Sequence, residues 1–315
     1  TTRDVLRLLE KLEAQHIDGL VLDLRDNGGG YLPEATALTG LFIPHGPVVQ
    51  LRDRNGRIEV LDDPEQGPAY TGPLAVLVNR LSASASEIFA GAIQDYHRGL
   101  IIGQNTFGKG TVQNLVPLDR WSDQPVDGQL TVTIGKFYRV TGESTQHRGV
   151  VPDIPLPSPI DPKDIGEADQ PNSLPWDRIS GVPFKTGTGV AAVPSITQLE
   201  ADETARTQHD PNYQWLVADI NTIDGLRAEH TVSLNVTARR DERSREDKTM
   251  LSLDNKRRAA LGLPALTSVE QIDKGKDKIP DVILNQAADI TADMIALDNS
   301  SLSVEKTAST GRPDR

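Results

Sequence analysis

Short apolar runs alternate with amphipathic stretches through the first half of the chain. Apolar residues at helical spacing predict helices at about 3–15, at about 33–42 and from the serine cluster 82–86 to about residue 96. Continuous or alternating apolar runs predict strands at 19–24, 48–52, 57–61, 74–78, 100–102, 112–118 and 130–138. Asn55-Gly56 lies between two of these runs and is typical of a tight hairpin turn. Strands with helices between them predict an α/β fold.

The pattern changes after residue 155. Residues 156–194 are rich in Pro, Asp, Gly and Ser, which indicates a linker or a surface crossing. Four helices are then predicted, at about 195–208, 212–226, 240–260 and 280–297, so residues 195–298 are interpreted as a mainly helical C-terminal domain. The charge-dense run 239–248 carries both signs and is typical of a solvated helix face. The Ser- and Thr-rich end, 299–315, is predicted to be disordered.

Composition narrows the possible partners. With 33 Lys and Arg against 45 Asp and Glu, the net charge of −12 argues against nucleic acid or an anionic membrane surface. The chain has no cysteine, which excludes disulfides, cysteine nucleophiles and thiolate metal sites, and its six histidines show no metal-binding spacing. No apolar run approaches the roughly 20 residues of a transmembrane segment. The chain opens at Thr1 in a helix pattern without a signal peptide, and we interpret it as a piece of a longer protein.

A serine cluster and a glycine-flanked lysine supply the candidate chemistry. Ser84 stands three residues before Glu87, the spacing of a capping box at a helix start. A serine hydroxyl needs an adjacent base to become a nucleophile, and a lysine can serve if burial favours its neutral amine. Lys109, in the sequence F-G-K-G, is that candidate base, and Gln113 can hold its orientation. Together they predict a Ser–Lys variant of the Ser-His-Asp site.

Backbone groups complete the predicted site. Ala85 lies at a helix start, where free N–H groups and the helix dipole favour negative charge. With one N–H group from Gly28–Gly30, it could form an oxyanion hole. Asp95 lies eleven residues after Ser84, about 16 Å along a helix axis, and is therefore interpreted as structural.

Each candidate also has a simpler interpretation. Serines before helices are usually caps, a Gly-Lys-Gly turn is usually solvated, and His97 fits a surface position at a helix end. Gly103 through Lys109 matches most of a nucleotide-binding P-loop. However, Gly110 replaces the hydroxyl residue that would bind Mg²⁺, and a strand is predicted to follow where a helix is required. An NTPase is therefore a weak alternative.

The order of motifs resembles the C-terminal processing peptidases, and especially their long, tail-specific form from Gram-negative bacteria. The motifs are DLRDNGGG, SASASEIFAGAIQDY, TFGKGTVQ and GVVPDI, in that order. In that family the nucleophile is the middle serine of SASAS, matching Ser84, and the base is a lysine 25 residues later, matching Lys109. The glutamine four residues after the lysine matches Gln113. The family's oxyanion donors match Gly30 and Ala85, and an aspartate once proposed as catalytic matches Asp95.

The resemblance implies a ClpP/crotonase-like serine protease core at 1–155, with no metal and no other cofactor. It implies a periplasmic enzyme that cleaves protein or peptide substrates recognised through apolar C-termini, and a lipoprotein adaptor as a further partner. It also implies a helical region and a PDZ domain before the core, neither of which is recognisable here. A non-catalytic binding or scaffold module on the same fold is the alternative from a different class.

Overall fold

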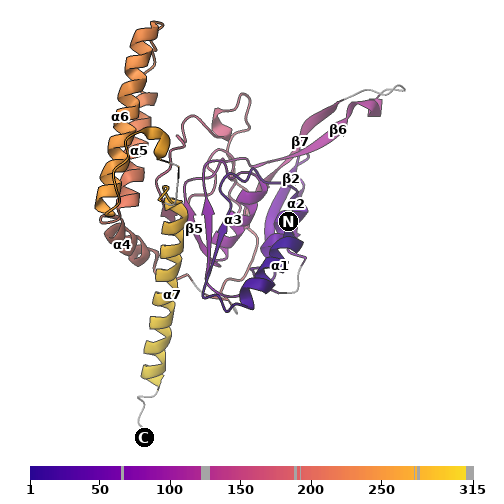
Figure 1. The fold of residues 1–315 in the computed structure, drawn as a ribbon. Helices are drawn as coiled ribbons and strands as arrows, with labels where there is room; N and C mark the ends of the chain where they lie inside the picture. The colour runs from indigo at the N-terminus through magenta and orange to yellow at the C-terminus, as the bar shows by residue number, and fades with distance from the viewer. Residues whose placement is uncertain are drawn as a thin grey trace. The chain divides into compact units, whose positions relative to one another are not determined.

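The computed structural model describes residues 1–64, 67–121, 128–187, 190–191, 193–272, 274 and 277–309 (Figure 1). The chain divides into two compact units. The first holds Thr1–Pro155, Ile160–Ile196 and the chain from Thr291 onward, and the second holds Leu156–Pro159 and Thr197–Ile290.

A parallel sheet forms one part of the first unit. Its strand order is β1 (Leu20–Asp23), β4 (Leu74–Val78), β5 (Leu100–Gly103) and β8 (Ile154–Pro155). All five residues of β4 are buried, as expected for a central parallel strand. Helices α1 (Thr2–Glu13), α2 (Leu32–Gly40) and α3 (Ala85–Asp95) lie wholly within the same unit. Helix α3 connects β4 to its parallel neighbour β5, so the two strands and the helix form a β-α-β unit.

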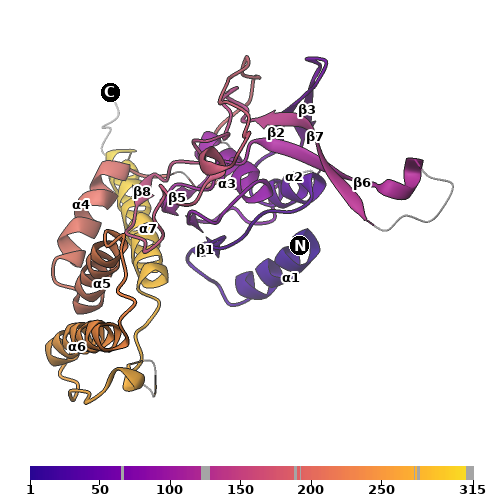
Figure 2. The ribbon, with the colours of Figure 1, turned by 90° about the horizontal axis from the view of Figure 1, so that it is seen from above.

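The first unit also contains a second sheet, which is antiparallel. Its order is β3 (Ile58–Asp62), β2 (Pro47–Asp53), β7 (Gln129–Tyr138) and β6 (Thr111–Pro117). The predicted hairpin at Asn55-Gly56 is confirmed, with Gly56 at a φ of 82° that favours glycine. Strand β7 pairs with β2 only over its last four residues, and its first part pairs with β6 alone. The β6–β7 hairpin therefore extends away from the body of the unit (Figure 2), and the short helix η1 (Leu118–Trp121) follows β6.

The core of the first unit is built from the apolar faces of these elements. Phe42 lies at its centre, with the rings of Tyr70 and Phe89 packed edge-on against it at centroid distances of 6.4 and 5.7 Å. All three rings are buried, as are the inward residues of α2 and α3. This core anchors the start of α3.

The segment after β8, predicted as a linker or a surface crossing, clusters mostly with the first unit. Most of residues 160–196, including the turn η2 (Glu167–Asp169), cluster with the first unit. Gln146 donates to the carbonyl of Leu174, Trp176 donates to the carbonyl of Ser144, and Arg178 forms a bridge with Glu143. A composition rich in Pro and Gly resembles a linker, yet here the segment finds hydrogen-bond partners in the loop after β7.

The second unit is helical. It contains α4 (Ile196–Thr207) from Thr197, α5 (Pro211–Arg227), α6 (Val236–Ala260), η3 (Val269–Gln271) and the first part of α7 (Val282–Ser309). Asp210 and Asn235 cap α5 and α6 by accepting backbone N–H groups. The cap at Asn235 explains why α6 begins before the predicted residue 240. The α/β class with a helical C-terminal region is thus confirmed.

Helix α7 continues further than expected. Disorder was predicted from residue 299, whereas the helix runs to Ser309, and residues 310–315 lie outside the described residues. The sequence has no glycine or proline between Val282 and Ser309, so nothing in it stops the helix. None of the helices in the described part of the chain is long and apolar enough to cross a membrane.

Candidate active site

Ser84 occupies the N-cap of α3 in an unusual backbone conformation. Its φ of 57° and ψ of −113° lie outside the regions that residues with a side chain prefer. Such a conformation costs about 1–3 kcal/mol and persists only where the surroundings hold it in place. The predicted capping box with Glu87 is confirmed. The half-buried Ser84 is therefore held at a strained turn between β4 and α3.

Glu87 connects this turn to the loop that carries Lys109. Its fully buried carboxylate accepts four hydrogen bonds. One oxygen accepts the backbone N–H groups of Ser84 at 2.8 Å and of Lys109 at 2.9 Å. The other accepts the N–H group of Gly108 at 2.7 Å and the hydroxyl of Thr106 at 2.5 Å. One carboxylate thus fixes the backbones of the candidate nucleophile and of the candidate base.

Burial also changes the acid–base behaviour of Glu87. Removal from water raises the pKa of its carboxyl group to about 7, and the four hydrogen bonds act in the opposite direction. Sequence reasoning identified Glu87 only as a capping partner of Ser84. The available signal was an acidic residue directly before the apolar pair Ile88-Phe89, where a buried carboxylate must find donors.

Lys109 and Gln113 are in direct contact, as the sequence interpretation required. The Lys109 amine donates to Gln113 Oε1 at 3.0 Å, and the Gln113 amide nitrogen lies 3.4 Å from the Thr133 hydroxyl. The loop before β6 is tied to the serine turn because Phe107 N–H donates to the carbonyl of Ser82. Among the described residues no hydrogen bond joins Ser84 Oγ to Lys109 Nζ.

The glycine loop after β1 lies against the serine turn. A Cβ atom on Gly29 would stand 2.5 Å from the carbonyl oxygen of Ala83 and 2.7 Å from the nitrogen of Ala85. Gly29 also has a φ of 94°, so both space and conformation require glycine there. Its N–H group donates to Asn27 Oδ1, which also accepts the Ser86 hydroxyl.

This arrangement distinguishes among the three glycines. The N–H group of Gly29 is occupied by Asn27, whereas those of Gly28, Gly30 and Ala85 have no acceptor in the part of the chain that the structure describes. Gly30 and Ala85 therefore remain candidate oxyanion donors. Their roles, like those of Ser84, Lys109 and Gln113, stay predictions.

A small cavity opens beside these donors. It has a volume of about 150 Å³ and is lined by Gly29, Gly30, Ala85 and Ser86 on one side. Its apolar wall consists of side chains from β1's end, α2 and α3, namely Leu24, Ala35, Leu38 and Phe89. A cavity of this size and lining can take a small or medium apolar side chain.

Asp95 lies at the other end of α3 from Ser84. It forms a bidentate ion pair with Arg139, with nitrogen–oxygen distances of 3.0 and 2.6 Å. Burial raises the pKa of Asp95, and its bonds to Arg139 oppose that shift. The structure therefore places Asp95 in an ion pair, apart from the contacts of Glu87 and Lys109. His97 is exposed just beyond the helix, and within the described residues no group of three His, Asp or Glu side chains could hold a metal ion.

Comparison with known protein families finds a match for each half of the chain. The description "Peptidase family S41" matches residues 1–156, and "C-terminal domain of tail specific protease" matches residues 160–296. The chain belongs to peptidase family S41. The resemblance to C-terminal processing peptidases that the motifs indicated is thus confirmed. The S41 match covers both the serine turn and the Lys109 loop.

Individual relatives of this S41 chain carry related names. The tail-specific protease of Haemophilus influenzae is 43% identical over 297 residues, which is 93% of this chain and 43% of the relative. A chloroplastic C-terminal processing peptidase of Tetradesmus obliquus is 36% identical over 52% of this chain and 34% of its own length. The chain therefore spans less than half the length of either relative. The solved photosystem II D1 C-terminal processing protease is 35% identical, covers 51% of this chain and 39% of its own, and has a TM-score of 0.44.

Proposed function

We propose that this S41 protein is a serine endopeptidase that uses Ser84 as nucleophile and Lys109 as general base. The observation that carries the proposal is the shared carboxylate of Glu87, which binds the backbone of both residues across 25 positions of sequence. Gln113 already contacts the Lys109 amine, so the base has a positioning partner. A serine and a lysine held together in this way fit acyl transfer.

In the proposed reaction, Ser84 Oγ attacks the carbonyl carbon of the scissile peptide bond. The neutral amine of Lys109 takes the hydroxyl proton and then donates it to the leaving amine, so that an acyl-enzyme and a new N-terminus form. Water next attacks the ester and gives its proton to Lys109. The new C-terminus leaves, and Ser84 regains its proton. The N–H groups of Ala85 and Gly30 stabilise the oxyanion in both steps.

The proposal requires the Ser84 hydroxyl and the Lys109 amine to come into hydrogen-bond contact. The Lys109 amine now donates to Gln113, and it must approach Ser84 Oγ for the proton transfer. Catalytic hydrogen bonds are often long or absent before substrate binds.

The substrates we propose are polypeptides recognised through their C-termini. The name of the Haemophilus influenzae relative supports this substrate class, and the apolar cavity beside Ala85 fits a small apolar side chain before the cleaved bond. We place the reaction in the periplasm, with a lipoprotein adaptor that delivers substrates. Both points follow from the resemblance and are tested by fractionating cells and by co-purification with the Ser84→Ala variant.

The catalytic assignment is tested by Ser84→Ala and Lys109→Ala in the complete protein. Each should abolish cleavage of an unfolded substrate with an apolar C-terminus, while thermal melting shows that the fold persists. The matched controls are Ser252→Ala and Lys11→Ala, which alter exposed residues of α6 and α1. Cleavage that survives in either active-site variant would refute the assignment, and a stable protein with partner binding but no turnover would favour a scaffold role.

A further inference from the structure

A second, larger pocket opens on the antiparallel sheet. It has a volume of about 450 Å³ and lies where β2 ends and β7 continues towards the hairpin tip. Ile134 and Lys136 contribute from β7, and Leu174 covers one side. Neither Lys109 nor Gln113 lines the pocket, but Thr133 does, and its hydroxyl lies 3.4 Å from the Gln113 amide nitrogen. The pocket therefore lies beside the Lys109–Gln113 pair without including it.

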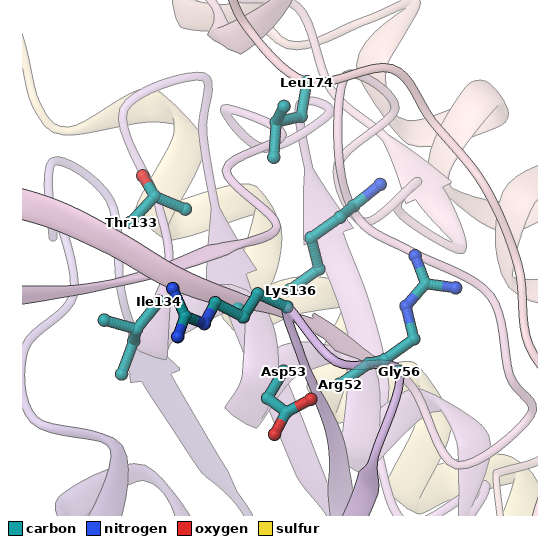
Figure 3. A pocket seen from close by; sticks show the side chains of 9 residues that line it. Arg52, Asp53, Gly56, Thr133, Ile134, Lys136 and Leu174 are labelled. Carbon is teal, nitrogen blue, oxygen red and sulfur yellow. The ribbon is translucent and has the colours of Figure 1, made fainter.

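The pocket is cationic in an acidic protein. Arg52, Arg54 and Lys136 line it, against the single lining carboxylate of Asp53. Figure 3 shows the Lys136 amine extending towards Leu174 with the Arg52 guanidinium beside it, while Asp53 points the other way. The Asp53 carboxylate is already engaged, because it accepts the N–H groups that close the β2–β3 turn.

The three cations are unevenly paired. Arg52 and Lys136 share one carboxylate, that of Asp177, which also accepts the hydroxyl of Tyr138. Arg54 is exposed and has no ion-pair partner among the described residues. Three positive charges thus face two carboxylates, Asp53 and Asp177. In a chain of net charge −12, this local excess is a distinct feature.

Apolar side chains accompany these charges. Ile58 stands opposite Arg52 across β3 and β2, Ile134 and Leu174 line the pocket, and Val132 lies two residues before Ile134 on β7. Ile58, Val132 and Ile134 are 44%, 40% and 38% exposed. A ligand that fits must therefore join an anionic group to neighbouring apolar groups.

We propose that this pocket binds the free C-terminal end of a polypeptide with apolar last residues. Its α-carboxylate would lie between Arg54 and the Arg52–Lys136 pair, and its last side chains would cover Ile134 and Leu174. A C-terminus fits because it carries its carboxylate directly beside an apolar side chain. Nucleic acid does not fit, because its repeated phosphates require many more cations than this excess. The inference rests on the proposed function, and it assigns that function a tail-holding position outside the cleavage site.

Binding is measured by fluorescence anisotropy on the Ser84→Ala variant, which cannot turn the peptide over. The probe is a fluorescein-labelled decapeptide ending in Ala-Val-Leu, prepared with a free carboxylate and with a C-terminal amide. The free acid should bind about tenfold more tightly than the amide, the value of one hydrogen bond to a charged group. Arg54→Gln should remove most of that difference. Arg57→Gln, in the same turn but outside the pocket, should leave it unchanged.

Several outcomes would overturn the proposal. Equal affinity for acid and amide, or an Arg54→Gln variant that binds as tightly as its parent, would show that no carboxylate is recognised here. An amidated peptide with an internal aspartate that binds as well as the free acid would assign the pocket to acidic side chains. A change in oligomeric state on Arg54→Gln, measured by sedimentation, would assign it to a second copy of the chain. Because none of these readouts requires cleavage, failure here is distinguishable from failure of the protease assignment.

Discussion

The carboxylate of Glu87 offers the most direct test of how the site is held together. Glu87→Gln keeps the size of the side chain but replaces one acceptor oxygen by an NH₂ donor. If the NH₂ group faced Ser84 and Lys109, both backbone N–H groups would lose their acceptor. The other orientation is less costly, because the Thr106 hydroxyl can accept from the new NH₂ group and only the Gly108 N–H group is left unpaired.

The size of the effect follows from this count. One buried, unsatisfied N–H group costs about 1–3 kcal/mol. In a unit of this size, that corresponds to a decrease in melting temperature of about 2–12 °C. Since Gly108 directly precedes Lys109, the loop should also shift, and a displacement of about 1 Å can lower the rate of an enzyme by about 100-fold. We therefore expect kcat to fall by about 10- to 100-fold with KM changed much less.

The assay compares Glu87→Gln with wild type and with Glu10→Gln, which alters an exposed residue of α1. Melting temperature and steady-state kinetics are measured on the same preparations, with kinetics recorded well below the lower melting temperature. A Glu87→Gln enzyme with wild-type kcat and unchanged stability would refute the positioning role. A raised KM with unchanged kcat would instead place Glu87 in substrate binding.

Three further predictions concern the same unit. Because burial raises the pKa of Glu87 to about 7, the folded protein keeps a proton on Glu87 between pH 4.5 and 7 that the unfolded chain has released. The contribution of Glu87 to the free energy of unfolding should therefore fall as pH rises through this window. Urea titrations at several pH values should show a flatter profile for Glu87→Gln than for wild type. Parallel profiles would contradict this. Ala35→Leu should fill the cavity beside Ala85 and disfavour substrates with a large apolar residue before the cleaved bond, relative to alanine, by about tenfold in kcat/KM; an unchanged ratio would exclude the cavity as the specificity site. Asp95→Asn should destabilise the fold by about 3 kcal/mol through the unpaired Arg139, while kcat stays near wild type; a kcat loss of about 100-fold or more in a stable protein would make Asp95 catalytic.

Local patterns in the sequence were enough to predict most elements and the candidate chemistry. The run Leu74–Val78 is wholly apolar and forms a wholly buried strand. The capping box at Ser84 and Glu87 marks the start of α3 because a helix start depends on a few consecutive residues. The contact between Lys109 and Gln113 is also local, since it joins residues four positions apart along one segment. Such features depend on spacing along the chain and can be read from it.

The order of the strands, the reach of Glu87 and the boundaries of the units were decided by tertiary structure. Pairing of β2 with β7 brings together residues about 85 positions apart, and no local preference specifies such a partner. Glu87 could be recognised as a cap, but its bonds to Thr106 and Gly108 exist only once β5 and its following loop have packed against α3. Asp177 lies in a stretch whose composition is that of a linker, and its ion pairs with Arg52 and Lys136 arise from the fold alone.

The glycine loop shows the same division in a single motif. Three consecutive glycines indicate a close approach of backbone, and that much is local. Which N–H group remains free depends on Asn27, whose side chain accepts from Gly29 and from Ser86 of another segment. The sequence by itself determined which residue types could perform acyl transfer. Only the packed structure decided which of their atoms are already paired and which are left to act, because hydrogen-bond partners are assigned by distances between segments far apart in the chain.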